Sequence, residues 1–128
     1  MLKIRLALIT VLLLLNMGCS SKNPVTDSIP KQVSVKEAKK MIDENKIQVV
    51  DVRTPEEFKD GHIPGAKLIP LQDVEKRLGE FNKEQAYLLV CHSGNRSVQA
   101  QDILEKHGFN NTYNMLQGMA QWPYKTEK

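Results

Sequence analysis

A cysteine and an arginine stand in one short segment whose composition and spacing could support nucleophilic chemistry. Cys91 follows the apolar run 86–90, which predicts a buried strand, and Arg96 comes five positions later. A thiol between a strand and a helix start lies near unpaired backbone N–H groups and the positive end of the helix dipole. Such surroundings stabilise the thiolate, which is the nucleophilic form of cysteine, and the cation of Arg96 adds to the effect. The segment therefore predicts a reactive thiol.

A helix is expected directly after this turn. Ser97 is placed to cap it and Gly108 to end it. Between them, one face carries residues at i, i+3, i+4 and i+7, the spacing of an amphipathic helix. These residues are Ala100, Ile103, Leu104 and His107. The thiol would then lie between a strand and the amino end of a helix.

The remaining elements alternate in the same way. Ser34 with Glu37 and Thr54 with Glu57 form capping boxes that predict two further helix starts. Short apolar strands are expected at 47–52, 67–69 and 112–115, with a helical segment at 72–78. Alternating strands and helices predict an α/β fold, with a parallel sheet flanked by helices on both faces.

Three blocks resemble the signatures of the rhodanese (sulfurtransferase) family. The segment 91–97, CHSGNRS, resembles the family's active-site loop. The segment 51–66 resembles its upstream signature, and 113–122, which contains Gly118, resembles its downstream one. The blocks occur in the family's order and together cover about 34–125. The departure is Met119, because the family usually shows a second glycine after the one that matches Gly118.

The resemblance implies a sulfur-transfer mechanism at Cys91. Its thiolate would attack the outer sulfur of a small anion such as thiosulfate, release sulfite, and pass the resulting persulfide sulfur to a thiol or cyanide acceptor. The residues expected to bind the substrate are His92, Ser93, Gly94, Asn95 and Arg96. Ser93, Gly94 and Asn95 would act through backbone N–H groups that converge on one point.

Several of these residues have two interpretations. Arg96 could bind the sulfonate end of a donor, or it could tie down the loop through carbonyls and a carboxylate. His92 could tune the thiol or point to solvent. Asp51 and Arg53 match family positions that support the loop, and a buried ion pair is the structural alternative.

Two other functions compete with sulfur transfer. Cysteine phosphatases use a similar loop with five residues between cysteine and arginine, whereas this chain has four, which suits a sulfur atom better than a phosphate. A sulfur-carrying or partner-docking module is the non-enzymatic alternative. The scattered histidines and one usable cysteine lack metal-ligand spacing, so neither a metal nor a cofactor is expected.

The first residues have the layout of an export signal. Two basic residues, Lys3 and Arg5, precede the apolar run 6–15, which is too short to span a bilayer comfortably. Gly18-Cys19 resembles the cleavage box of bacterial lipoproteins, although Asn16 departs from it. We expect a signal peptide at 1–18, lipidated Cys19 and a tether at 19–33, and the rhodanese-like domain at 34–126. An ordinary cleaved signal and a retained anchor are the alternatives.

This organisation places the protein in the cell envelope, anchored to a membrane by lipid. Ser20, which follows Cys19 where an aspartate would favour inner-membrane retention, points to the outer membrane if there is one. Loss of Lys3 and Arg5 with the signal lowers the formal charge from +3 to +1. A nearly neutral domain without a basic stripe does not predict nucleic-acid binding. With Cys19 lipidated, Cys91 would have no disulfide partner in the chain.

Overall fold

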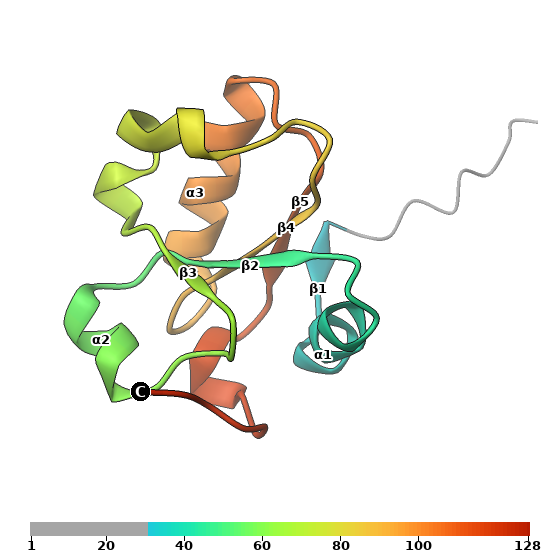
Figure 1. The fold of residues 1–128 in the computed structure, drawn as a ribbon, viewed down its shortest axis with the longest axis vertical. Helices are drawn as coiled ribbons and strands as arrows, with labels where there is room; N and C mark the ends of the chain where they lie inside the picture. The colour runs from blue at the N-terminus through green and yellow to red at the C-terminus, as the bar shows by residue number, and fades with distance from the viewer. Residues whose placement is uncertain (1–30) are drawn as a thin grey trace, which may run out of the picture.

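A parallel sheet organises the described part of the chain, residues 31–128 of a computed structural model. Its strands lie in the order β1-β5-β4-β2-β3, and every neighbouring pair is parallel (Figure 1). Their bounds are β1 (Gln32–Val33), β2 (Gln48–Asp51), β3 (Lys67–Leu68), β4 (Tyr87–Val90) and β5 (Thr112–Met115). Because β4 lies between β5 and β2, the residue that follows it emerges at the middle of the sheet's carboxyl edge.

The helices connect these strands as the alternating pattern predicted. The α-helices are α1 (Val35–Asp43), α2 (Pro55–Asp60) and α3 (Asn95–Lys106), and the 3₁₀ turns are η1 (Leu71–Asp73), η2 (Glu75–Glu80) and η3 (Gly118–Gln121). Both expected capping boxes are formed, Ser34 with Glu37 at α1 and Thr54 with Glu57 at α2. Gly108, with φ of 85°, follows the last turn of α3 as expected.

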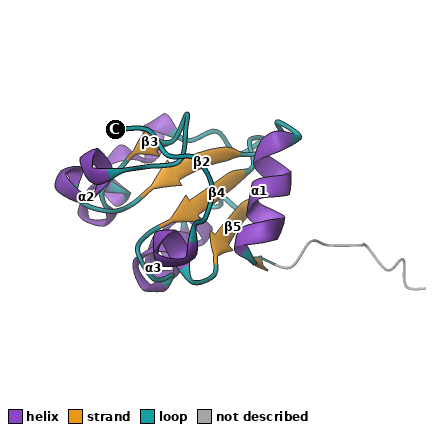
Figure 2. Cartoon of the chain, turned by 90° about the horizontal axis from the view of Figure 1, so that it is seen from below, coloured by secondary structure: helices purple, strands orange, loops and turns teal. Residues whose placement is uncertain are grey.

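Apolar layers cover both faces of the sheet. Side chains alternate along β4, so that Leu89 and Cys91 belong to one buried cluster while Leu88 and Val90 belong to the other. The first cluster includes Ala100 and Leu104 of α3, and the second packs against α1 and η3. Helices α1 and α3 accordingly lie on opposite sides of the strands (Figures 1 and 2). This confirms the α/β class with helices on both faces.

Some local expectations were wrong. Ser97 is not the cap of α3, because Gly94 occupies the N-cap position in a left-handed conformation, with φ of 95°. The segment 72–78 forms parts of two 3₁₀ turns rather than one helix, and its backbone kinks at Arg77. His107 does not pack on the inner face of α3; it is the exposed C-cap, with Nε2 3.3 Å from Glu75.

The amino-terminal predictions fall largely outside the described residues. The signal peptide, Cys19 and the tether up to residue 30 belong to that part of the chain. Gln32 and Val33 form β1 against β5, so the sheet begins before the expected boundary at Ser34. Within residues 31–128, no helix is both long and apolar enough to cross a membrane.

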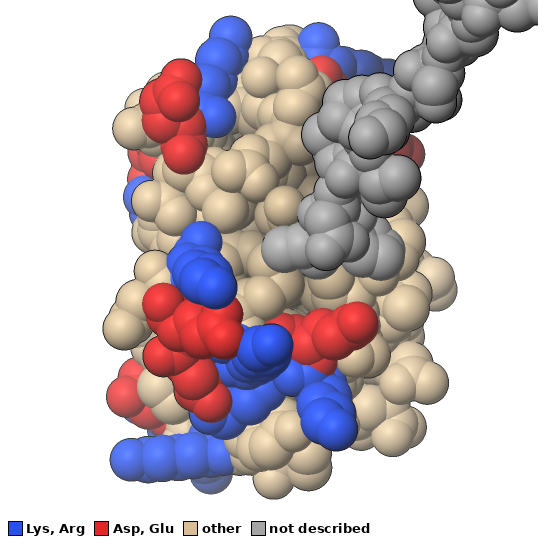
Figure 3. Space-filling model, turned by 90° about the vertical axis from the view of Figure 1, so that its right-hand side faces the viewer, with Lys and Arg blue, Asp and Glu red and all other residues tan. Residues whose placement is uncertain are grey.

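Charges on the described surface are mixed in sign. On the face shown in Figure 3, Lys and Arg side chains lie beside Asp and Glu side chains. Lys39 pairs with Asp43 on α1, and just after this helix Glu44 lies 2.6 Å from the ammonium group of Lys46. A separate basic stripe of the kind that binds nucleic acid is not seen on this face.

Candidate active site

The Cys91 sulfur lies beneath the turn that joins β4 to α3. The backbone N–H of Gly94 donates to Sγ at 3.1 Å, and the Ser97 hydroxyl oxygen lies 3.3 Å from Sγ. Left-handed Gly94 turns its N–H inward, and Ser97, in the first turn of α3, is fully buried beside the sulfur. The residue Cys91 is 1% exposed, so the polar groups of the loop and a small part of the core surround it.

These contacts decide the acidity of the thiol. Burial acts to raise the pKa of Cys91, because it disfavours the charged form. Hydrogen bonds that the thiolate can accept, from the Ser97 hydroxyl and from the backbone N–H groups of Ser97, Ser93 and Gly94, act in the other direction. Their combined effect leaves the pKa of Cys91 below its ordinary value. The site therefore favours the thiolate despite being buried.

The segment after β5 anchors the loop from behind. The N–H groups of Met119 and Ala120 donate to the carbonyl oxygens of Cys91 and His92 at 2.8 and 2.9 Å. Gly118 makes this approach possible, because a Cβ there would lie 2.3 Å from the Cys91 carbonyl oxygen and 2.5 Å from the His92 carbonyl group. The downstream block thus fixes the loop by close backbone contact.

The backbone conformation shows which neighbour of Gly118 favours a second glycine. Gln117 and Gly118 are consecutive left-handed residues, with φ of 63° and 57°. Met119 has no such conformation. Backbone that favours glycine therefore lies before Gly118, at Gln117, and the sequence-based assignment of the departure to Met119 has no backbone basis.

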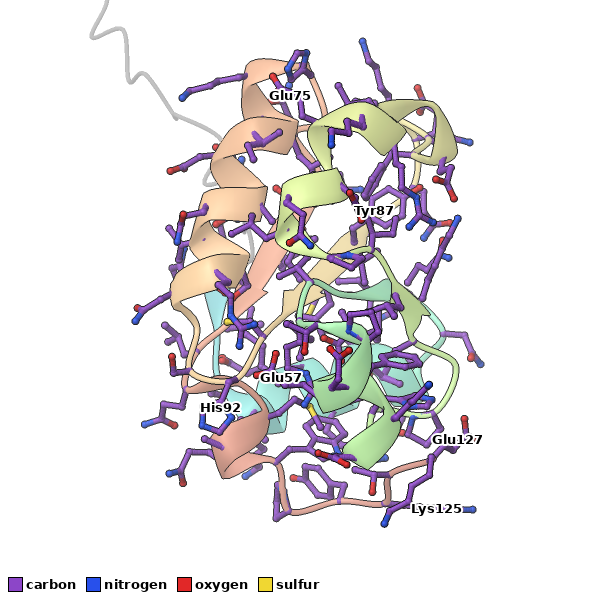
Figure 4. The ribbon with its side chains drawn as sticks, turned by 90° about the vertical axis from the view of Figure 1, so that its left-hand side faces the viewer. Glu57, Glu75, Tyr87, His92, Lys125 and Glu127 are labelled. Carbon is purple, nitrogen blue, oxygen red and sulfur yellow. The ribbon has the colours of Figure 1, made fainter. Side chains whose placement is uncertain are left out.

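Arg96 is held by a carboxylate from α2. Its two terminal nitrogens donate to the two oxygens of Glu57 at 2.7 and 2.8 Å, a bidentate pair that is about one third exposed. The hydrogen bond from Arg96 is the main cause that lowers the pKa of Glu57, to about 2, and the same bond raises the pKa of Arg96. Glu57 and His92 lie in the lower half of the view in Figure 4, and Glu75 lies at its top. Of the two interpretations of Arg96, this geometry matches the one in which it ties down the loop through a carboxylate. An anionic donor would have to compete with Glu57 for the guanidinium.

Asp51 and Arg53 form the buried pair that was the structural alternative. Arg53 Nη2 donates to Asp51 Oδ2 at 2.7 Å and to the Gly61 carbonyl oxygen at 2.9 Å. Both side chains are almost fully buried. The pair joins the end of β2 to the end of α2, the helix that carries Glu57, and so supports the loop indirectly.

The other loop side chains face solvent. His92, Ser93 and Asn95 are exposed, and the His92 ring makes no hydrogen bond to any side chain or backbone group of residues 31–128. Within residues 31–128 there is no group of three or more His, Cys, Asp or Glu side chains that could hold a metal ion. A cavity of about 320 Å³ lies elsewhere, lined by residues at the starts of β2 and β4, such as Gln48 and Gln85, at the opposite edge of the sheet from Cys91.

Three side chains of the site were not predicted from the sequence. Ser97 was read only as a cap, Glu57 only as part of a capping box, and Asn114 not at all. Asn114 is 1% exposed and accepts a hydrogen bond from the Ser97 hydroxyl. A polar residue in a strand expected to be buried was the available signal for Asn114. The pairing of Glu57 with Arg96 spans 39 positions and leaves no local signal.

Comparisons with known proteins agree with this fold and site. A family model described as "Rhodanese-like domain" matches residues 34–125. The chain is 40% identical over 109 residues to the "Putative sulfur carrier protein YrkF" of Bacillus subtilis, which covers 84% of this chain and 57% of that protein. It is also 27% identical over 92 residues to the "Thiosulfate sulfurtransferase GlpE" of Pseudoalteromonas translucida, covering 72% of this chain and 88% of that protein.

A solved structure shows the same architecture. The crystal structure of a rhodanese-like domain protein from Staphylococcus aureus superposes with a TM-score of 0.70 at 39% identity, covering 75% of this chain and 95% of that one. This chain belongs to the rhodanese-like domain family. It spans 57% of the length of YrkF and 61% of a second Bacillus subtilis relative, YqhL.

Proposed function

We propose that this rhodanese-domain protein is an exported sulfurtransferase that moves a sulfane sulfur through a persulfide on Cys91. The observation that carries the proposal is the position of Sγ, which accepts the Gly94 N–H at 3.1 Å inside a turn whose Ser93 and Ser97 N–H groups also favour the anion. The same donors that stabilise a thiolate stabilise the negative charge of a persulfide. Relatives named as sulfurtransferases support this choice of reaction.

The proposed reaction has two displacements at sulfur. The Cys91 thiolate attacks the outer sulfur of thiosulfate, a new S–S bond forms, and the old S–S bond breaks with its electron pair leaving on sulfite. An acceptor thiolate or cyanide then attacks the outer sulfur of the persulfide. The bond between the two persulfide sulfurs breaks, and its electron pair returns to Cys91 as the thiolate.

Access to the thiol favours a slender donor. Cys91 is 1% exposed, so a donor has to bring a slim reacting atom to a nearly buried sulfur. A terminal sulfane sulfur meets this requirement better than a tetrahedral phosphate ester.

Turnover of thiosulfate and cyanide to thiocyanate tests the proposal. Wild type should turn over and Cys91→Ser should not, while His107→Gln, a change at the exposed end of α3, should keep wild-type activity. Intact-mass analysis after thiosulfate should show an increment of about 32 daltons, one sulfur atom, on wild type only. Equal rates for wild type and Cys91→Ser would refute the assignment.

A sulfur carrier is the second candidate function, and the name of the relative YrkF favours it. A carrier would acquire the same mass increment on Cys91 without catalysing thiocyanate formation. The two measurements together therefore separate carrier from enzyme. Hydrolysis of a phosphate ester that depends on Cys91 would instead support the phosphatase alternative.

The proposed location rests on the amino-terminal sequence. We propose a lipid anchor on Cys19 that holds the domain at the envelope surface, on the basis of the apolar run 6–15 and the Gly18-Cys19 pair. Metabolic labelling with a fatty acid should mark wild type, and Cys19→Ala should abolish the label. Labelling that persists in Cys19→Ala would exclude the anchor.

A further inference from the structure

A continuous chain of side-chain hydrogen bonds leads from the Cys91 sulfur to β1. The Ser97 hydroxyl lies 3.3 Å from Sγ and donates to Asn114 Oδ1. Asn114 Nδ2 donates to Gln32 Oε1 at 2.6 Å, and Gln32 Nε2 donates to Gln101 Oε1 at 3.1 Å. The chain thus connects residues of α3, β5 and β1, and its two ends are the catalytic sulfur and Gln101.

Two backbone carbonyls set the direction of this chain. Gln101 Nε2 lies 3.0 Å from the Thr112 carbonyl oxygen and 3.5 Å from that of Lys31. Carbonyl oxygens only accept hydrogen bonds, so the amide nitrogen of Gln101 has to face them and its oxygen has to face Gln32. Gln32 must then present its own oxygen to Asn114, which in turn presents its oxygen to Ser97.

This direction decides where the hydroxyl hydrogen of Ser97 points. A serine hydroxyl has one hydrogen to donate. Because Asn114 Oδ1 is an acceptor, the Ser97 hydrogen points toward Asn114. The Ser97 oxygen can then only accept a hydrogen bond from the S–H group of Cys91. A thiolate at Cys91 needs the same hydrogen, since an anion accepts a hydrogen bond and cannot donate one. Asn114 and the thiolate therefore compete for it.

We propose that Asn114 is a positioning residue that holds the Ser97 hydrogen away from Cys91, and that Gln32 and Gln101 enforce this orientation. The chain stabilises the protonated thiol, in opposition to the backbone N–H groups of Ser93, Gly94 and Ser97. When Cys91 loses its proton to solvent, Ser97 turns its hydrogen to the sulfur and Asn114 Oδ1 loses its donor. The side chains on β1 and β5 thus limit how much of the resting protein is thiolate.

Charged groups around the thiol stay constant in the proposed test. They are Arg96 on α3 with its partner Glu57 on α2, and the buried pair formed by Asp51 and Arg53 at the end of β2. The substitutions below leave all four in place and are neutral in charge. A change in thiol acidity is then attributable to the redistribution of hydrogen bonds.

The decisive variant is Gln32→Met, because Gln32 is exposed and its loss leaves the core intact. Without Gln32 Oε1, the Asn114 amide can turn and donate Nδ2 to Ser97, which releases the Ser97 hydrogen to the sulfur. Asn114→Leu releases it directly. Each should lower the thiol pKa by about half a unit to one unit, the scale of one hydrogen bond. Gln121→Met, the same change at an exposed glutamine of η3, should leave it unchanged.

The thiol pKa is read from the pH dependence of iodoacetamide alkylation, which requires no sulfur donor and so does not depend on the proposed turnover. Below the pKa, Gln32→Met should react roughly 3- to 10-fold faster than wild type. In a Ser97→Ala background, the same substitution should have no effect, because the shared hydrogen is gone. An unchanged or raised pKa in Gln32→Met, or a shift that persists with Ser97→Ala, would overturn the proposal. Gln32→Met decides the matter even if Asn114→Leu fails to fold.

Discussion

Gly118 is the position where one added methyl group should test the anchoring of the active-site loop. In Gly118→Ala the new Cβ would lie 2.3 Å from the Cys91 carbonyl oxygen and 2.5 Å from the carbonyl carbon and oxygen of His92. All three atoms belong to the backbone, so no side-chain rotation relieves the contact. The loop and the η3 segment have to move apart.

The expected loss of stability has two parts. A left-handed conformation, here with φ of 57°, costs an ordinary residue about 1–2 kcal/mol, and the reduced entropy of the unfolded chain offsets about 0.5–1 kcal/mol of this. Separation of the loop also breaks the hydrogen bonds that Met119 and Ala120 donate to the Cys91 and His92 carbonyls. At about 1 kcal/mol each, these bring the total to about 3 kcal/mol.

Two other glycines separate these contributions. Gly65 is left-handed, with φ of 78°, but a Cβ there would meet nothing within 4 Å. Gly65→Ala should therefore show the backbone cost alone, about 1 kcal/mol or less. Gly79 has open space and no left-handed conformation, so Gly79→Ala should raise the free energy of unfolding by about 0.5–1 kcal/mol, through the unfolded chain alone. Urea unfolding of the three variants and wild type measures each free energy of unfolding.

The contact should also be visible in the chemistry of the loop. Displacement of the Cys91 and His92 carbonyls turns the N–H groups of the loop away from Sγ, so alkylation of Cys91 should slow in folded Gly118→Ala and stay at the wild-type rate in Gly65→Ala. If Gly118→Ala were no more destabilised than Gly65→Ala, the reasoning that η3 holds the loop by close approach would be refuted.

Three further predictions concern the turn before η3 and the start of α2. Gln117→Gly should raise the free energy of unfolding by up to about 1 kcal/mol, because it removes left-handed strain, whereas Leu116→Gly should lower it; urea unfolding checks both. Glu57→Gln keeps the cap but breaks the ion pair with Arg96. Because the pair is about one third exposed, wild type should be more stable than this variant by at most about 1 kcal/mol in free energy of unfolding at pH 7. Since the pKa of Glu57 falls from 4.5 to about 2 on folding, this advantage should vanish as the pH falls through that interval, and a constant difference would contradict it. Thr54→Ala should cost about 1 kcal/mol by removing the cap of α2, again by urea unfolding.

The sequence predicted most of what local chemistry controls. The capping boxes at Ser34 and Thr54 formed because each joins residues three positions apart. Buried strands were visible as apolar runs, and the strand-to-helix junction at Cys91 followed from the change of period. The parallel sheet then follows from the alternation of these elements.

What the sequence did not predict depends on contacts between distant segments or on backbone geometry. Ser97 has the side chain of a cap, but left-handed Gly94 begins the helix earlier and turns Ser97 toward the sulfur. Its partner Asn114 lies 17 positions away on another strand. The helix expected at 72–78 lacks a side-chain cap in the structure, and the two 3₁₀ turns are held by packing of residues such as Val74.

Two different constraints act on the Cys91 sulfur, and they should be separable in one pair of measurements. The contact with Gly118 fixes where the backbone N–H groups point, so Gly118→Ala should raise the thiol pKa and move the pH profile of alkylation to higher pH. The side chains of Gln32 and Asn114 act on one hydrogen of Ser97, so their loss should move the profile the other way, to lower pH. Because the backbone contact and the amide chain share no hydrogen bond, the effects of Gly118→Ala and Gln32→Met should add in a double variant. A large departure from additivity would show that the loop and the amide chain move as one unit, and the thiol would then have a single determinant.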